Sequence, residues 1–119
     1  MDAPAYTYRA HVVRCVDGDT VVLDIDAGLY MTARKQVVRL AGIDTPEMRG
    51  PERPAGEIAS EWLRSRIEDK DVIVQTIKDK RGDDDRGKYG RWLARIWIDG
   101  RCVNDDLLAE GLAVVPGYS

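Results

Sequence analysis

The chain alternates short segments rich in β-branched residues with tight polar turns, and this pattern restricts it to a mainly β fold. Asp17-Gly18 and Asp99-Gly100 are dipeptides that favour two-residue hairpin turns. Val, Ile and Thr between the turns suit a pleated, half-buried surface. Strands are predicted over residues 8–16, 20–25, 36–43, 72–77, 91–98 and, more briefly, 113–115. We therefore expect antiparallel strands, several of them joined as hairpins.

Two helices are expected to interrupt the strands. Over residues 57–68, apolar residues recur at three- and four-residue spacing and form one stripe: Ile58, Ala59, Trp62, Leu63 and Ile67. A shorter helix is predicted over residues 105–110, with Asn104 as its cap and Gly111 at its end. Residues 46–56 and 78–89 are predicted as loops. Residues 26–35 are predicted as a loop or a strand extension.

The order of these elements narrows the fold further. Three strands, a helix, two strands and a second helix fit the OB-fold, a five-stranded Greek-key β-barrel. The predicted class is therefore mainly β with two helices (α+β). The 119 residues match the length of one ordinary domain and can bury a core, so we expect residues 1–119 to form a single domain.

Charge is distributed unevenly along the chain. The formal net charge is −3, but residues 30–101 hold 16 basic and 13 acidic side chains. The middle of the chain therefore carries a net charge of +3 and could face a phosphate chain. No apolar run is long enough to cross a membrane. No secretory signal is visible in the first residues, which leaves open a cytoplasmic, a phage-encoded and a secreted, trimmed protein.

The cysteines and the single histidine give little sign of a metal centre. Cys15 and Cys102 are far apart and form no CxxC pair, so we interpret them as small apolar core residues. Whether they form a disulfide is left open. His11 lies in an apolar stretch and has no second histidine to act with, so no catalytic or metal-binding role is expected for it.

Three carboxylates lie where predicted strands begin or end. Asp19 follows the first turn, Asp44 ends the third strand, and Glu47 comes three residues later. Carboxylates and backbone carbonyls are the ligands that calcium prefers. Without a cation, clustered carboxylates would repel each other and raise their pKa values. These positions therefore suggest a site for one hard cation.

Two arginines complete a set suited to phosphate chemistry. Arg39 lies five residues before Asp44, and Arg91 begins the fifth predicted strand. A guanidinium offers a planar fork of donors that matches two phosphate oxygens, and fixed donors stabilise charge that develops in the transition state. Taken alone, each feature has a plainer explanation, because Asp-Gly-Asp-Thr is usually a turn and a strand arginine is usually solvated. The combination favours phosphodiester hydrolysis with a cation, arginines and a nearby glutamate.

Three blocks, DGDTVVL, RLAGIDTPE and KYGRWLARIW, resemble the signature segments of the staphylococcal nuclease (thermonuclease) family. The resemblance runs from about Val12 to Val115. It implies an OB-type barrel and a calcium-dependent nuclease acting on DNA and/or RNA by 5′-side P–O cleavage, which leaves 3′-phosphate ends. A monomer is expected.

The same resemblance implies a role for each site residue. Asp19 and Asp44 would bind calcium directly, and Thr45 would bind it through its backbone carbonyl. Glu47 is implied as the general base. The scissile phosphate and the nucleotide would be bound by four residues, of which the two arginines are also catalytic: Arg39, Lys88, Tyr89 and Arg91.

Some features depart from the family pattern and leave other functions open. Asp83, Asp84 and Asp85 lie where relatives tend to be more basic, so we expect weaker substrate binding. The alternative functions are a catalytically inactive OB-fold module that binds nucleic acid or a protein, and a structural or inhibitory scaffold.

Overall fold

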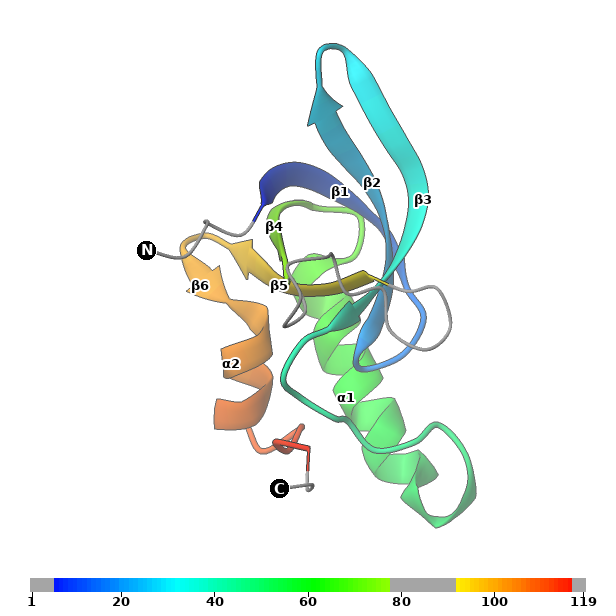
Figure 1. The fold of residues 1–119 in the computed structure, drawn as a ribbon. Helices are drawn as coiled ribbons and strands as arrows, with labels where there is room; N and C mark the ends of the chain where they lie inside the picture. Colours follow the sequence, from blue (N-terminus) through cyan, green and yellow to red (C-terminus); the bar gives the residue numbers. More distant parts are fainter. Residues whose placement is uncertain (1–5, 78–91, 117–119) are drawn as a thin grey trace.

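The computed structural model describes residues 6–77 and 92–116, whose strands form one six-stranded sheet (Figure 1). The strands are β1 (Thr7–Cys15), β2 (Thr20–Gly28), β3 (Met31–Leu40), β4 (Asp71–Thr76), β5 (Trp92–Ile98) and β6 (Arg101–Cys102). Their order in the sheet is β3-β2-β1-β4-β5-β6, and all these neighbours are antiparallel. A parallel pairing of Val38–Leu40 with residues 92–94 joins β3 to β5 and closes the first five strands. The predicted five-stranded, OB-type α+β barrel is confirmed.

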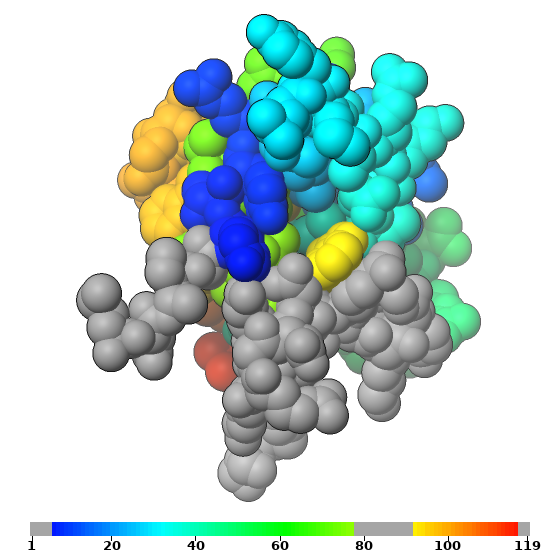
Figure 2. Space-filling view, turned by 45° about the horizontal axis from the view of Figure 1, so that its top comes forward, coloured from blue at the N-terminus to red at the C-terminus, as the bar shows by residue number. Residues whose placement is uncertain are grey.

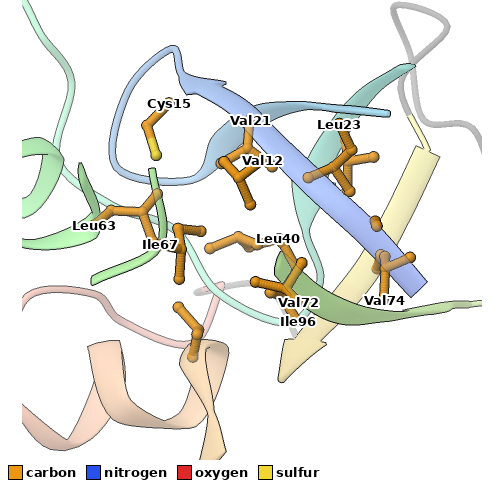
Figure 3. Close-up of a cluster of buried hydrophobic side chains, with 14 of the residues drawn as sticks. Val12, Cys15, Val21, Leu23, Leu40, Leu63, Ile67, Val72, Val74 and Ile96 are labelled. Carbon is orange, nitrogen blue, oxygen red and sulfur yellow. The ribbon is translucent and has the colours of Figure 1, made fainter. Parts of the chain in front are cut away.

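Two helices, α1 (Arg53–Ile67) and α2 (Val103–Ala109), lie below the barrel in Figure 1, and a short 3-10 turn, η1 (Gly50–Glu52), precedes α1. Figure 3 shows Leu63 and Ile67 of α1 among the strand side chains Val12, Val21 and Leu40. Four residues of the predicted apolar stripe therefore face the core, namely Ala59, Trp62, Leu63 and Ile67. Ile58 was wrongly included, because its side chain is 60% exposed. Neither of these helices is long and apolar enough to cross a membrane.

The strand extension predicted as one alternative for residues 26–35 is confirmed, since these residues lengthen β2 and β3 into a long hairpin with a two-residue turn. Other predicted boundaries were wrong, each for a local reason. The third strand ends at Leu40, before Gly42 takes a left-handed conformation (φ 76°). Helix α1 begins at Arg53 inside a predicted loop, because a proline is tolerated in the first turn of a helix. The predicted strand over 113–115 is reduced to one bridge between Asp44 and Val114.

Both cysteines are buried and free, which confirms them as core residues and excludes a disulfide in this structure. Burial, followed by the negative charge of Glu68, raises the pKa of the Cys15 thiol to about 12. The Glu68 carboxylate accepts a hydrogen bond from the Cys15 backbone N–H at 2.8 Å. A thiol held this far from ionisation is unreactive, so Cys15 has a packing role.

Asn104 is not the helix cap that we predicted. Helix α2 begins at Val103, so Asn104 lies inside its first turn, and the Asn104 side chain is fully buried. Its amide nitrogen donates to the carbonyls of Ala41 (2.9 Å) and Ala94 (3.1 Å), and its oxygen accepts from the Ile96 N–H (3.1 Å). The side chain therefore ties α2 to β5 and to the segment that follows β3.

Replacing Asn104 with Ala should destabilise the fold by about 2–4 kcal/mol, because buried backbone groups lose their partner. The free energy of unfolding from urea denaturation measures this loss. Asp105→Asn on the same helix, which removes only an exposed ion pair with Arg95, is the control and should cost less than about 1 kcal/mol. An Asn104→Ala variant as stable as the control would contradict the role assigned to this network.

His11 lies on the surface between two carboxylates. Its Nδ1 is 2.8 Å from Asp71 Oδ1, and its Nε2 is 2.9 Å from Asp69 Oδ1. The hydrogen bond to Asp71, followed by the one to Asp69, raises the pKa of His11 above its usual value. Within residues 6–77 and 92–116, no three His, Cys, Asp or Glu side chains are arranged to hold a metal ion. The two carboxylates favour the protonated, positively charged form of the imidazole.

The raised pKa of His11 predicts a pH-dependent contribution to stability. A group whose pKa is higher in the folded state stabilises the protein fully below its unfolded pKa, near 6.5 for histidine. That contribution is lost as the pH rises through the folded value. The melting temperature of wild type should therefore exceed that of His11→Gln at pH 5.5, and the difference should shrink towards pH 9. A difference that does not change with pH would contradict this assignment.

Candidate functional site

An open cleft of about 580 Å³ lies where β2 begins and β3 ends. Its lining comes from the β1–β2 turn, the end of β3 and the segment that leads to α1: Asp17, Asp19, Arg39, Asp44, Thr45, Pro46, Glu47, Met48, Arg49 and Glu52. Five of the predicted site residues are in this lining: Asp19, Arg39, Asp44, Thr45 and Glu47. The other three, Lys88, Tyr89 and Arg91, lie outside the described residues, as do Asp83, Asp84 and Asp85.

The β1–β2 turn places Asp19 at the mouth of the cleft. The Val16 and Asp17 N–H groups donate to the carbonyl of Thr20 at 2.8 and 3.3 Å, which closes the turn. Within it, the Asp17 carboxylate accepts from the Asp19 N–H at 3.0 Å. Burial, followed by the hydrogen bond with the Asp19 side chain, raises the pKa of Asp17. Asp17 therefore supports the turn, and the Asp19 carboxylate faces the cleft.

Strand register brings Arg39 beside Asp19. Thr20 of β2 pairs with Arg39 of β3, and the Leu40 N–H donates to the Asp19 carbonyl at 2.8 Å. The Arg39 guanidinium Nη2 donates to the Asp44 carboxylate and lies 3.5 Å from Asp19 Oδ2. It also donates to the Ile43 carbonyl at 3.4 Å. One cationic group therefore holds together carboxylates from two separate segments.

Arg39 therefore partly offsets the repulsion between Asp19 and Asp44 that was expected without a cation. Arg39 is 24% exposed and Asp19 13%, so their charges attract each other in a poorly solvated place. Every hydrogen bond between the Arg39 guanidinium and the described residues is made by Nη2. Nε and Nη1 make none with these residues, so they could donate to a ligand in the cleft.

The segment after β3 is fixed at two points. Asp44 and Val114 exchange two backbone hydrogen bonds of 2.8 Å, so the chain after α2 holds Asp44 in place. The Thr45 N–H donates to Asp19 Oδ2 at 3.3 Å, which connects the segment to the β1–β2 turn. Together these contacts place the Asp44 side chain and the Thr45 backbone next to Asp19.

Two glycines allow the loops of the site to pack closely on α1. A Cβ atom on Gly18 would lie 2.9 Å from Thr45 Oγ1 and 3.0 Å from the Ala59 Cβ. A Cβ on Gly56 would lie 2.3 Å from the carbonyl oxygen of Glu47, a backbone atom that cannot rotate away. The small residues on α1 are therefore what lets the Glu47 backbone approach the helix.

Glu47 lines the same cleft but has different partners. Its side chain is 62% exposed, and its Oε2 lies 3.4 Å from Arg49 Nε. Its N–H donates to Glu52 Oε1 at 3.3 Å. The sequence interpretation missed Arg49, Glu52 and Asp17 as cleft residues. Only Asp17 gave a signal, because it lies two residues before Asp19 in the same turn.

The donor set of the cleft fits a hard cation. Asp19 and Asp44 both reach the single nitrogen Nη2 of Arg39, so their oxygens converge on one small region. Two carboxylates and the Thr45 carbonyl are oxygen ligands of the kind that calcium binds, and the cleft lining contains no His or Cys. Since no third carboxylate of the described residues joins them, water or phosphate oxygens would have to complete the coordination.

Comparison with known proteins adds the family to this geometry. Residues 37–118 match the family described as "Staphylococcal nuclease homologue". The chain belongs to this family. It is 32% identical to the thermonuclease of Staphylococcus hyicus over 98% of this chain and 63% of that protein. For the thermonuclease of Staphylococcus intermedius the identity is 33%, over 90% of this chain and 59% of the relative.

A third relative is the endonuclease YncB of Bacillus subtilis. It is 36% identical over 86% of this chain and 45% of its own length. The chain therefore spans about half to two thirds of the length of these three relatives. The family match confirms the resemblance found in the three sequence blocks.

Gly56→Ala tests how the helix positions the segment that carries Glu47. The added methyl group would collide with the Glu47 carbonyl, so we expect a loss of stability of about 1–3 kcal/mol. Helix propensity alone would give the opposite sign, since Ala is favoured over Gly by roughly 1 kcal/mol. Urea denaturation decides between them, with Ser65→Ala on an exposed part of α1 as the control. A more stable Gly56→Ala variant would show that the close approach is not required.

Proposed function

We propose that this chain is a calcium-dependent nuclease that hydrolyses phosphodiester bonds in DNA and/or RNA and leaves 3′-phosphate ends. The observation that carries the proposal is the convergence of Arg39, Asp19 and Asp44 in one open cleft. Arg39 Nε and Nη1 make no hydrogen bond to the described residues, and an arginine of this kind beside two carboxylates suits a phosphate that is bridged to a cation. The relatives named thermonuclease and endonuclease support the same activity.

Each residue has a defined task in this proposal. Asp19, Asp44 and the Thr45 carbonyl would hold calcium, which when bound would neutralise charge on the phosphate and activate it towards attack. The donors of Arg39 would bind the scissile phosphate and stabilise the charge that develops on its oxygens. Glu47, exposed on the same cleft wall, would take the proton of the attacking water. Arg91, Tyr89 and Lys88 are also proposed to bind the substrate, with Arg91 in addition catalytic.

Two conservative substitutions test the roles of the chain's own residues. Arg39→Lys keeps the charge but loses the fork of donors, so kcat should fall on the order of 10²-fold or more. Glu47→Gln keeps the size and removes the basicity, so kcat should fall by about 10²–10⁴-fold. Cleavage of single-stranded DNA and of RNA is measured with calcium and then with a chelator.

The matched control for Arg39→Lys is Arg101→Lys, which changes an arginine that pairs with Asp106 outside the cleft. It should keep the wild-type rate, and circular dichroism checks that every variant is folded. If folded wild type cleaves neither substrate with calcium between pH 7 and 10, the proposal fails. The same holds if both cleft variants match wild type. The inactive nucleic-acid- or protein-binding module would then replace it.

A further inference from the structure

The β2–β3 hairpin extends away from the barrel body and ends in an unusual turn (Figure 1). Leu29 and Tyr30 form its two-residue connection, with φ angles of 56° and 62°. Hairpin turns with positive φ at both positions strongly favour Asn-Gly, because most side chains are strained there. Two large side chains at this turn therefore cost the fold stability.

These side chains are almost completely exposed. Leu29 is 89% exposed, Tyr30 109% and the adjacent Met31 63%. In Figure 2 the cyan atoms of this hairpin stand out at the top of the surface. Single exposed apolar residues are common, but three in succession on a strained, protruding turn point to contact with another molecule. We call Leu29, Tyr30 and Met31 the hairpin tip.

A basic strand connects the hairpin tip to the cleft. β3 carries three basic residues, Arg34, Lys35 and Arg39, and no acidic one. The side chains of Arg34 and Lys35 are exposed and pair with no side chain of the described residues. Among those residues β3 pairs with β5 only over Val38–Leu40, so the remainder of its outer edge faces no described strand. A plainer explanation of a lysine on an edge strand is that it prevents aggregation. That role does not explain the exposed apolar residues of the hairpin tip.

The spacing suits a polynucleotide. Arg39 lies nine positions after Tyr30, which corresponds to about 30 Å along a strand. OB-folds bind single strands of about 4–16 nucleotides by combining a basic groove with aromatic side chains on which bases stack. Positive charge on the β3 edge and an aromatic ring at its far end provide both elements.

We propose that the hairpin tip and the basic edge of β3 bind single-stranded nucleic acid beyond the cleft. Tyr30 would stack on a base, and Arg34 and Lys35 would contact phosphates between that base and Arg39. This inference rests on the proposed function, because the bound strand is the part of the substrate that leaves the cleft.

The double substitution Leu29→Asn/Tyr30→Gly tests the proposal with two readouts, because it should stabilise the fold and weaken substrate binding. It supplies the residues that the turn prefers, so the melting temperature should rise by about 5 °C or more. It also removes the stacking surface, so KM for a 20-nucleotide single strand should rise on the order of 5-fold or more. KM for a trinucleotide, which is too short to reach the tip from the cleft, should not change.

Two further variants separate the contributions. Arg34→Gln/Lys35→Gln should make the affinity for the 20-nucleotide strand less dependent on salt, since each lost phosphate contact lowers the slope by roughly 0.7. Ile58→Ala removes an apolar side chain that is 60% exposed on α1 and should leave KM for both substrates at the wild-type value.

The outcomes also distinguish this inference from the proposed function. If wild type cleaves neither substrate, the proposed function fails. Fluorescence anisotropy of the labelled 20-nucleotide strand then still tests the tip, with weaker binding by Leu29→Asn/Tyr30→Gly as the supporting result. An unchanged KM and an unchanged affinity in that variant would overturn the inference. The inference would also be overturned if wild type self-associated in sedimentation velocity, and the Leu29→Asn/Tyr30→Gly variant lost this association with KM unchanged. The hairpin tip would then bind a second copy of the chain.

Discussion

The contact of Arg39 with Asp19 and Asp44 is the interaction on which the cleft depends. It joins three segments that the sequence separates, and the strand register of β2 and β3 together with the closure of the barrel by β5 sets its position. Without Arg39, two neighbouring carboxylates would have no positive charge beside them. Loss of Arg39 should therefore destabilise the metal-free protein, whereas loss of Asp44 leaves a balanced pair of Arg39 and Asp19.

The barrel supplies this cluster with rigid support from several directions. Gly18 and Gly56 let two loops approach α1 more closely than side chains would allow. Buried Asn104 and the bridge between Asp44 and Val114 hold the segment after β3 against the second helix. The carboxylates of the cleft therefore sit on loops, but these loops are held by backbone contacts to regular elements, which favours a preorganised site.

The sequence predicts the class of the fold well because β-branched segments, Asp-Gly turns and one apolar helical stripe all indicate the same barrel. It also predicts five residues of the cleft lining, through their positions at strand ends and in the family blocks. The start of α1 was missed because prolines suggest a loop, and Asn104 was misassigned because a buried side-chain network leaves no local signal. The Leu29-Tyr30 turn was missed because its local signal is misleading. Leucine and tyrosine are residues that a turn with two positive φ angles disfavours.

The central claim is that Asp19 and Asp44 form one site, whose negative charge Arg39 offsets in part and which can bind a calcium ion. Isothermal titration with calcium chloride tests this most directly, using wild type, Asp44→Asn and Arg39→Gln without substrate. The account predicts one calcium per wild-type chain, at least 10-fold weaker binding by Asp44→Asn, and tighter binding by Arg39→Gln, because the carboxylates lose a competing positive charge. Folded wild type that binds no calcium, or equal affinities in all three proteins, would contradict it.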